Sequence, residues 1–150
     1  MIHVLVLNGP NLGRLGLREP EIYGSRTHDD LVEVCRETGR KLGQHVEVRQ
    51  SDSEAELIGW VHEAADGHIP VVLNAGALTH YSYALMDAVK TRTAPLVEVH
   101  ISNIAARAVS EPFRRESVLT AVADGIIAGF GFVSYQLALQ AIAELTAADT

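Results

Sequence analysis

The sequence lacks several features that mark particular protein classes. Its 150 residues include one cysteine, Cys35, which excludes a disulfide framework and a cysteine-rich zinc site. No apolar run approaches the length of a membrane span. The N-terminus shows no basic segment followed by an apolar core, so we expect no signal peptide and a cytoplasmic location.

Positive charge is also scarce. Twelve Lys and Arg stand against 19 Asp and Glu, for a net charge of −7. No basic patch is visible, which argues against nucleic acid or an anionic membrane as partner, whereas a small anionic ligand needs only a few arginines. The only lysines, Lys41 and Lys90, fall away from any expected crevice. A Schiff-base mechanism is therefore not expected.

Short apolar runs alternate with segments of helical periodicity along the whole chain. We predict strands at 2–7, 45–50, 69–73, 96–101 and 125–129, and helices at 27–42, 53–65, 81–91 and 134–145, with an irregular stretch at 102–117. Such alternation indicates a parallel sheet covered on both faces, with right-handed crossovers. We expect one catalytic domain, residues 1–150, with a flavodoxin-like, three-layer, doubly wound α/β fold of strand order 2-1-3-4-5.

Polar residues follow three of the predicted strands, at Asn8 to Asn11, Asn74 to Gly76 and His100 to Asn103. Doubly wound sheets bind ligands beyond the carboxyl ends of their strands. These three segments therefore predict a shared crevice.

The long loop at 7–24, LNGPNLGRLGLREPEIYG, invites a nucleotide-binding interpretation. Its glycines, Gly9, Gly13 and Gly16, follow a GxxxGxxG spacing and not the dinucleotide pattern GxGxxG. No P-loop occurs, and the bare GxG at Gly129–Gly131 favours close packing of a helix. A flavin or another phosphate ligand stays a minority alternative.

Two histidines, His80 and His100, fall where strands deliver side chains to the crevice. Glu98 shares a strand face with His100 because strand side chains repeat every two residues, so its carboxylate can orient the imidazole. A functional role is favoured for His100, while His80 fits a structural role equally well. We place the remaining histidines at the surface: His3, His28, His45, His62 and His68.

A metal site built from His80, His100, Asp87 and Glu98 is not supported by any ligand spacing, so no metal is expected. Arg18 and Tyr23 offer a different base. Lowering a phenol pKa from about 10 by about 3 units takes roughly 4 kcal/mol, which one guanidinium about 4 Å away can supply. Spacing alone favours the ordinary alternative, a packed Tyr beside a solvated Arg.

Five motifs in combination are more specific than any one of them. They are LNGPNLGRLGLREPEIYG, RQSDSEAELIGWVHEA, LNAGALTHYSYALMDAV, VEVHISN and GFGFVSYQLAL. Together they resemble the type II 3-dehydroquinate dehydratases, from about Val4 to Ile142. The resemblance implies a cofactor-free and metal-free lyase of the shikimate pathway, assembled as a homododecamer of four trimers. The reaction is the reversible anti elimination of water from 3-dehydroquinate to 3-dehydroshikimate, in chorismate and aromatic amino acid biosynthesis or in quinate catabolism.

The resemblance also implies residue roles. Tyr23 would remove the C2 proton, and Arg18 would lower the pKa of the Tyr23 hydroxyl. Asn11 would hold the water or the enolate oxygen, and His100 would protonate the departing hydroxyl. The loop from about Leu12 to Tyr23 would close over the substrate.

Further residues are implied as substrate contacts. Asp87 would reach the ligand from a neighbouring subunit. The others are Asn74, Gly76, His80, Ile101, Ser102 and Arg114.

One segment departs from the family pattern. Six residues instead of three separate Arg107 from Arg114, and Ala105 stands where the family has His. A dehydratase with an altered substrate and a non-catalytic flavodoxin-like binding module therefore stay as alternatives.

Overall fold

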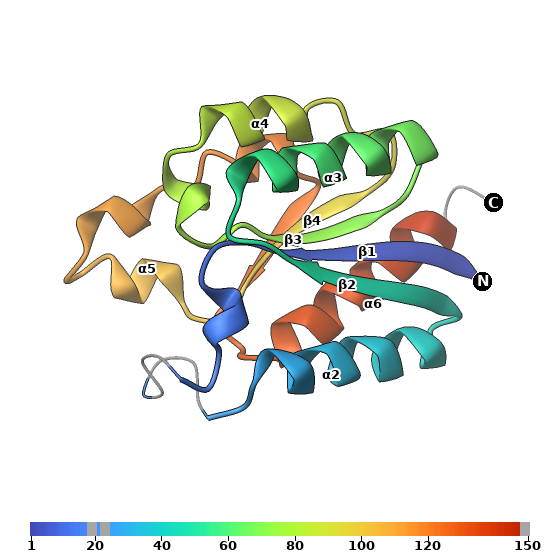
Figure 1. The fold of residues 1–150 in the computed structure, drawn as a ribbon, viewed down its shortest axis with the longest axis horizontal. Helices are drawn as coiled ribbons and strands as arrows, with labels where there is room; N and C mark the ends of the chain where they lie inside the picture. Colours follow the sequence, from blue (N-terminus) through green and yellow to red (C-terminus); the bar gives the residue numbers. More distant parts are fainter. Residues whose placement is uncertain (18–20, 22–24, 148–150) are drawn as a thin grey trace.

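A computed structural model describes residues 1–17, 21 and 25–147 (Figure 1). Its five parallel strands form one sheet in the order β2-β1-β3-β4-β5, which confirms the predicted fold class and strand order. The strands are β1 (Ile2–Asn8), β2 (Gln44–Gln50), β3 (Val71–Asn74), β4 (Leu96–His100) and β5 (Gly125–Ala128).

Helices cover both faces of the sheet. Figure 1 shows α3 (Glu54–Gly67) and α4 (Tyr83–Val89) on one face, and α2 (His28–Lys41) and α6 (Val133–Ala147) on the other. The short α5 (Ile104–Arg107) lies at the end of the molecule to which the strands point. Four 3₁₀ turns complete the described chain: η1 (Leu12–Arg14), η2 (Gly76–His80), η3 (Pro112–Arg115) and η4 (Thr120–Val122).

Local side chains set the helix starts that the sequence predicts. Thr27 caps α2 through a reciprocal pair of hydrogen bonds. The Thr27 hydroxyl accepts from the Asp30 backbone N–H, and the Asp30 carboxylate accepts from the Thr27 backbone N–H. Ser53 caps α3 by accepting from the backbone N–H of Glu56. Each cap satisfies N–H groups that have no partner inside the helix.

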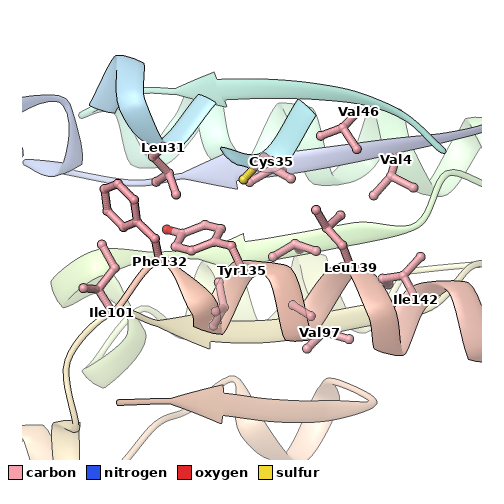
Figure 2. Close-up of a cluster of buried hydrophobic side chains, with 14 of the residues drawn as sticks. Val4, Leu31, Cys35, Val46, Val97, Ile101, Phe132, Tyr135, Leu139 and Ile142 are labelled. Carbon is pink, nitrogen blue, oxygen red and sulfur yellow. The ribbon is translucent and has the colours of Figure 1, made fainter. Parts of the chain in front are cut away.

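The sheet separates two hydrophobic cores. Alternation along β1 sends Val4 and Val6 toward α2 and α6, and Leu5 and Leu7 toward α3 and α4. Figure 2 shows the first core, with Tyr135 of α6 among its aliphatic side chains. Because β1 is buried on both faces, it reads in sequence as a continuous apolar run.

Several element ends differ from the prediction by one or two residues, and two differences bear on the site. The third helix begins at Tyr83 and not at Tyr81, because η2 runs to His80 and Ser82 then caps α4 by accepting from the Leu85 N–H. The stretch 102–117, predicted as irregular, contains α5 and η3. Among the described residues, no helix has both the length and the apolarity to span a membrane.

Candidate active site

A pocket lies at the carboxyl ends of β1, β3 and β4, where the sequence predicts the crevice. The segment after each of these three strands contributes residues to the pocket wall, and α5 and η3 supply the others. Its lining consists of Pro10, Asn11, Leu12, Asn74, Gly76, Ala77, His80, His100, Ile101, Ser102, Ile104, Arg107 and Arg114.

The loops after β1 and β3 approach each other closely at the pocket. Gly76 has a φ of 59°, and a Cβ there would lie 2.9 Å from the Pro10 carbonyl oxygen, so only glycine fits without displacement. Asn11 also has a left-handed backbone, with φ 71°, and its N–H donates to Oδ1 of Asp52 at 2.9 Å. The root of the first loop is thereby tied to the end of β2.

His100 and Glu98 form a buried pair in β4. The His100 Nε2 lies 2.5 Å from Oε2 of Glu98, and their side chains are 6% and 0% exposed. A carboxylate only accepts, so Nε2 donates to Glu98 and Nδ1 is the ring nitrogen left for the pocket. The expected carboxylate–imidazole arrangement is present.

Two hydroxyl groups complete the coordination of this carboxylate. Ser117 donates to Oε2 of Glu98 at 2.8 Å, and Thr120 donates to Oε1 at 2.6 Å. Burial by itself would raise the pKa of Glu98, but the hydrogen bonds from His100, Thr120 and Ser117 outweigh it and lower that pKa. Glu98 is therefore an anion directly behind His100, and it accepts the hydrogen bond that orients the imidazole.

His80 lies at the edge of the pocket. Its Nδ1 is 2.8 Å from the Glu116 carbonyl oxygen, so this nitrogen carries a proton and donates. Burial lowers the pKa of His80, so the ring is neutral at neutral pH and its Nε2 is an acceptor. Phe113 packs edge-on against the ring, with centroids 5.7 Å apart.

The segment that departs from the family pattern places two guanidinium groups in the pocket wall. Arg114 donates to both carboxylate oxygens of Glu111, at 3.0 and 3.5 Å, and Nη2 of Arg107 lies 3.6 Å from the same carboxylate. Arg107 also donates to the Ser102 hydroxyl at 3.4 Å. The site thus holds the two positive charges that an anionic ligand requires.

Most of the predicted site residues come together. Those that line the pocket are Asn11, Asn74, Gly76, His80, His100, Ile101, Ser102 and Arg114. Asp87 does not line it; its side chain is 71% exposed and lies 3.6 Å from Lys90. Arg18 and Tyr23 lie outside the described residues. No group of three or more His, Cys, Asp or Glu side chains in the described chain is placed to hold a metal ion.

Two histidines predicted at the surface, His3 and His28, are half-buried instead. His28 is half-buried at the start of α2, and its Nε2 lies 3.1 Å from Nδ2 of Asn8. No local pattern indicates the contact of His28 with Asn8, because the two residues are 20 positions apart on different elements. Arg107 is a further pocket residue to which spacing alone assigned no role, and Glu111 contacts it and Arg114 from outside the lining.

Comparisons with known proteins agree with this arrangement. The family model described as dehydroquinase class II matches residues 2–143. The chain is 60% identical over 142 residues to a 3-dehydroquinate dehydratase of Salinispora arenicola, covering 95% of this chain and 97% of that protein. It is 56% identical over 141 residues to a 3-dehydroquinate dehydratase of Mycobacterium tuberculosis, covering 94% of each.

Solved structures agree equally well. The type II dehydroquinase of Propionibacterium acnes superimposes with a TM-score of 0.92 at 56% identity, over 96% of this chain and 97% of that one. The type II dehydroquinase of Butyrivibrio crossotus gives a TM-score of 0.90 at 39% identity, over 94% and 97%. The chain belongs to the class II dehydroquinase family.

Proposed function

We propose that this protein is a 3-dehydroquinate dehydratase, which removes water from 3-dehydroquinate through an enolate to give 3-dehydroshikimate. The observation that carries the proposal is the Glu98–His100 pair in the wall of a pocket that also presents two arginines. An anionic hydroxy-ketone needs such a proton donor and such positive charges. The similarity to proteins named for this activity gives the substrate.

The acid in this proposal is His100. When both ring nitrogens carry protons, Nε2 stays bonded to Glu98 and Nδ1 can give its proton to the departing hydroxyl. The C–O bond then breaks, water leaves, and the electron pair of the enolate forms the new carbon–carbon double bond. The ionised Glu98 would hold the ring through Nε2 while Nδ1 gives up its proton.

The base in this proposal is Tyr23, which takes the C2 proton as a phenolate. Its support is the REPEIYG motif and the magnitude of the effect that Arg18 exerts on a nearby phenolate. The loop that carries both residues begins at Asn11 in the pocket wall, which supports a role for this loop at a bound ligand. Asn11 would hold the oxygen of the enolate.

The remaining pocket groups bind the substrate in this proposal. Ser102, the Ile101 backbone and Arg114 would contact its carboxylate, while Asn74 and neutral His80 would bond to its hydroxyl groups. Their support is their common position in the pocket wall. The closely packed Gly76 would keep the loop of Asn74 and His80 against the first loop.

We further propose a cytoplasmic homododecamer built as four trimers. The support is the family resemblance and the position of Asp87, whose exposed carboxylate does not line the pocket of its own chain. Contact with a ligand would therefore need an adjacent subunit. Light scattering of the purified protein measures the mass, and Asp87→Asn should lower turnover without dissociating the assembly.

Turnover of purified protein tests the activity directly. Addition of 3-dehydroquinate should generate the ultraviolet absorbance of a conjugated enone, and borohydride with substrate should leave the enzyme active because no imine forms. Tyr23→Phe should nearly abolish turnover, whereas Tyr83→Phe, at a tyrosine that is 67% exposed, should not affect it.

The alternatives predict different results. A binding module would be stabilised by the ligand without producing enone, and Tyr23→Phe would not change it. A dehydratase with an altered substrate would act on another cyclic hydroxy-keto acid. Folded, oligomeric wild-type protein that forms no enone at any pH would overturn the proposal.

A further inference from the structure

A continuous hydrogen-bond chain runs behind the pocket wall, from the loop after β3 to the start of α2. The Gly76 N–H donates to Oδ1 of Asn74 at 3.2 Å, and Nδ2 of Asn74 donates to the Tyr135 oxygen at 2.9 Å. The Tyr135 hydroxyl donates to Oδ1 of Asn8 at 2.7 Å, and Nδ2 of Asn8 lies 3.1 Å from Nε2 of His28. Only Asn74 and Gly76 line the pocket.

The residues of this chain come from five separate elements, with Gly76 at the start of η2. Asn8 and Asn74 stand side by side at the ends of β1 and β3. Tyr135 reaches them from α6 through the hydrophobic core (Figure 2), and His28 is the first residue of α2. A polar connection through an apolar core is costly unless every member is satisfied.

Burial makes the pairing obligatory. Asn8 and Tyr135 are 0% exposed and Asn74 is 3% exposed, so water cannot replace a missing partner. Within the described chain, none of the buried polar atoms of these three side chains lacks a hydrogen bond. The amide of Asn74 uses its oxygen and one hydrogen in this chain, and one hydrogen is left for the pocket.

The direction of every bond follows from one backbone group. The Gly76 N–H can only donate, so it fixes the oxygen of Asn74 on its side and the NH₂ of Asn74 toward Tyr135. The Tyr135 oxygen accepts that hydrogen, so its own hydrogen must find an acceptor, which is Oδ1 of Asn8.

The last bond is then fixed as well. The amide nitrogen of Asn8 faces His28 and donates, so Nε2 of His28 must be a bare acceptor and the ring proton must reside on Nδ1. Burial lowers the pKa of His28 and raises that of the Tyr135 hydroxyl, so the ring stays neutral and the hydroxyl keeps its proton.

We propose that His28, Asn8 and Tyr135 are positioning residues that hold the Asn74 amide with its free N–H directed at the ligand, and that His28 is locked as the Nδ1–H tautomer. The kinetic part of this proposal rests on the proposed dehydratase activity, whereas the tautomer does not. An inverted Asn74 amide would set its NH₂ against the Gly76 N–H and present an acceptor to the pocket. The chain therefore selects for a ligand oxygen at that point.

The variant Tyr135→Phe tests the kinetic part, because it removes only the shared hydroxyl and keeps the ring in the core. Loss of one hydrogen bond to the substrate corresponds to a rise in KM for 3-dehydroquinate of about tenfold, with kcat changed less than about threefold. The matched control is Gln44→Leu. This variant removes the buried hydrogen bond that Nε2 of Gln44 donates to the Leu139 carbonyl oxygen. Like the Tyr135 hydroxyl bond, it joins the sheet to α6, but it lies at the opposite end of the strands.

The result expected is a raised KM for Tyr135→Phe alone, with comparable loss of thermal stability in both variants. A wild-type KM for Tyr135→Phe, or an equal rise for Gln44→Leu, would overturn the positioning role. His28 gives a second comparison. His28→Gln retains a hydrogen-bond acceptor and should keep KM within about threefold of wild type. His28→Leu has no acceptor and should raise KM as Tyr135→Phe does.

Nitrogen-15 NMR of histidine-labelled protein tests the tautomer independently of activity. The signals of His28, assigned by their absence from the His28→Gln spectrum, should show a protonated Nδ1 and an unprotonated Nε2 at neutral pH. A protonated Nε2 would mean that the Asn8 amide is reversed, and it would overturn the proposal. If the wild type fails to dehydrate 3-dehydroquinate, the proposed function fails while the tautomer result stands or falls by itself.

Discussion

Oε2 of Glu98 accepts from Nε2 of His100 and from the Ser117 hydroxyl, at 2.5 and 2.8 Å. The His100 side chain, 6% exposed, reaches the pocket, while the Glu98 carboxylate is 0% exposed behind it. A buried carboxylate with this many donors fixes both the orientation of the imidazole and the nitrogen that faces the pocket. Under the proposed function, Glu98 would be a positioning residue and His100 would be the group that meets the substrate.

Glu98→Gln should separate these roles. The amide keeps the volume but removes the charge, and hydrogen bonds to charged groups contribute about 1.5–3 kcal/mol, so we expect kcat to fall about 10- to 100-fold. Enone formation at saturating 3-dehydroquinate measures it. Glu63→Gln removes a carboxylate that is bonded to Arg49 on the surface of α3 and should leave kcat unchanged. Equal rates in the two variants would contradict the assignment.

The same carboxylate should make stability depend on pH. The folded-state pKa of Glu98 is lowered relative to an unfolded value of about 4.3, so the unfolded chain binds more protons between the two values. The stabilisation is therefore complete above pH 5 and is lost as the pH falls through the folded pKa. Denaturant unfolding from pH 3 to 7 should show a loss toward low pH that is smaller in Glu98→Gln. Identical dependence of stability on pH in wild type and Glu98→Gln would show that the ionised Glu98 does not stabilise the fold.

One of the two arginines in η3 gives a prediction about binding. Arg114 holds Glu111 through two donors and lines the pocket, a fork geometry that lysine cannot reproduce. Arg114→Lys should raise KM for 3-dehydroquinate about tenfold or more, with a smaller effect on kcat. Arg115→Lys is the matched control, because that side chain is exposed and does not line the pocket. The interpretation fails if both variants have the same KM.

Much of this architecture can be predicted from sequence because its causes are local. The period of two places Glu98 and His100 on one face of β4, and the residues at Thr27 and Ser53 mark helix starts. Alternating apolar runs and helices predict a doubly wound parallel sheet, for which 2-1-3-4-5 is a common order of five strands. These features depend on neighbours within a few residues, or on a rule that holds for all such folds.

The rest of the site depends on contacts between distant segments. Asp52 holds the Asn11 N–H across 41 positions, and His28 meets Asn8 across 20. No periodicity encodes such pairs, so His28 was expected at the surface. Glu111 meets Arg114 nearby in sequence, but through the turn geometry of η3, a segment where periodicity predicts no regular structure.

The lone cysteine should be inert in the folded protein. Burial in the core beside α6 raises the pKa of the Cys35 thiol to about 12, whereas a free thiol has a pKa of about 8.5. At pH 8 only about one thiol in ten thousand is then ionised. Iodoacetamide should not label native protein within hours but should label one site per chain in denaturant. Rapid labelling of the native state would show that the α2–sheet core opens readily.

Two glycines with opposite environments should respond to alanine in opposite directions. Gly76 has a φ of 59° and its added Cβ would lie 2.9 Å from the Pro10 carbonyl oxygen, so Gly76→Ala should destabilise the protein by about 1–3 kcal/mol and lower kcat/KM by separating the two pocket loops. Gly59 lies inside α3 with no atom within 4 Å of an added Cβ. Gly59→Ala should stabilise the protein by about 0.5–1 kcal/mol, because alanine lowers the conformational entropy of the unfolded chain and meets no atom in the folded one. Turnover should be unchanged. Denaturant unfolding and enone kinetics on both variants measure this, and a Gly76→Ala protein as stable and active as wild type would show that the loops can separate without cost.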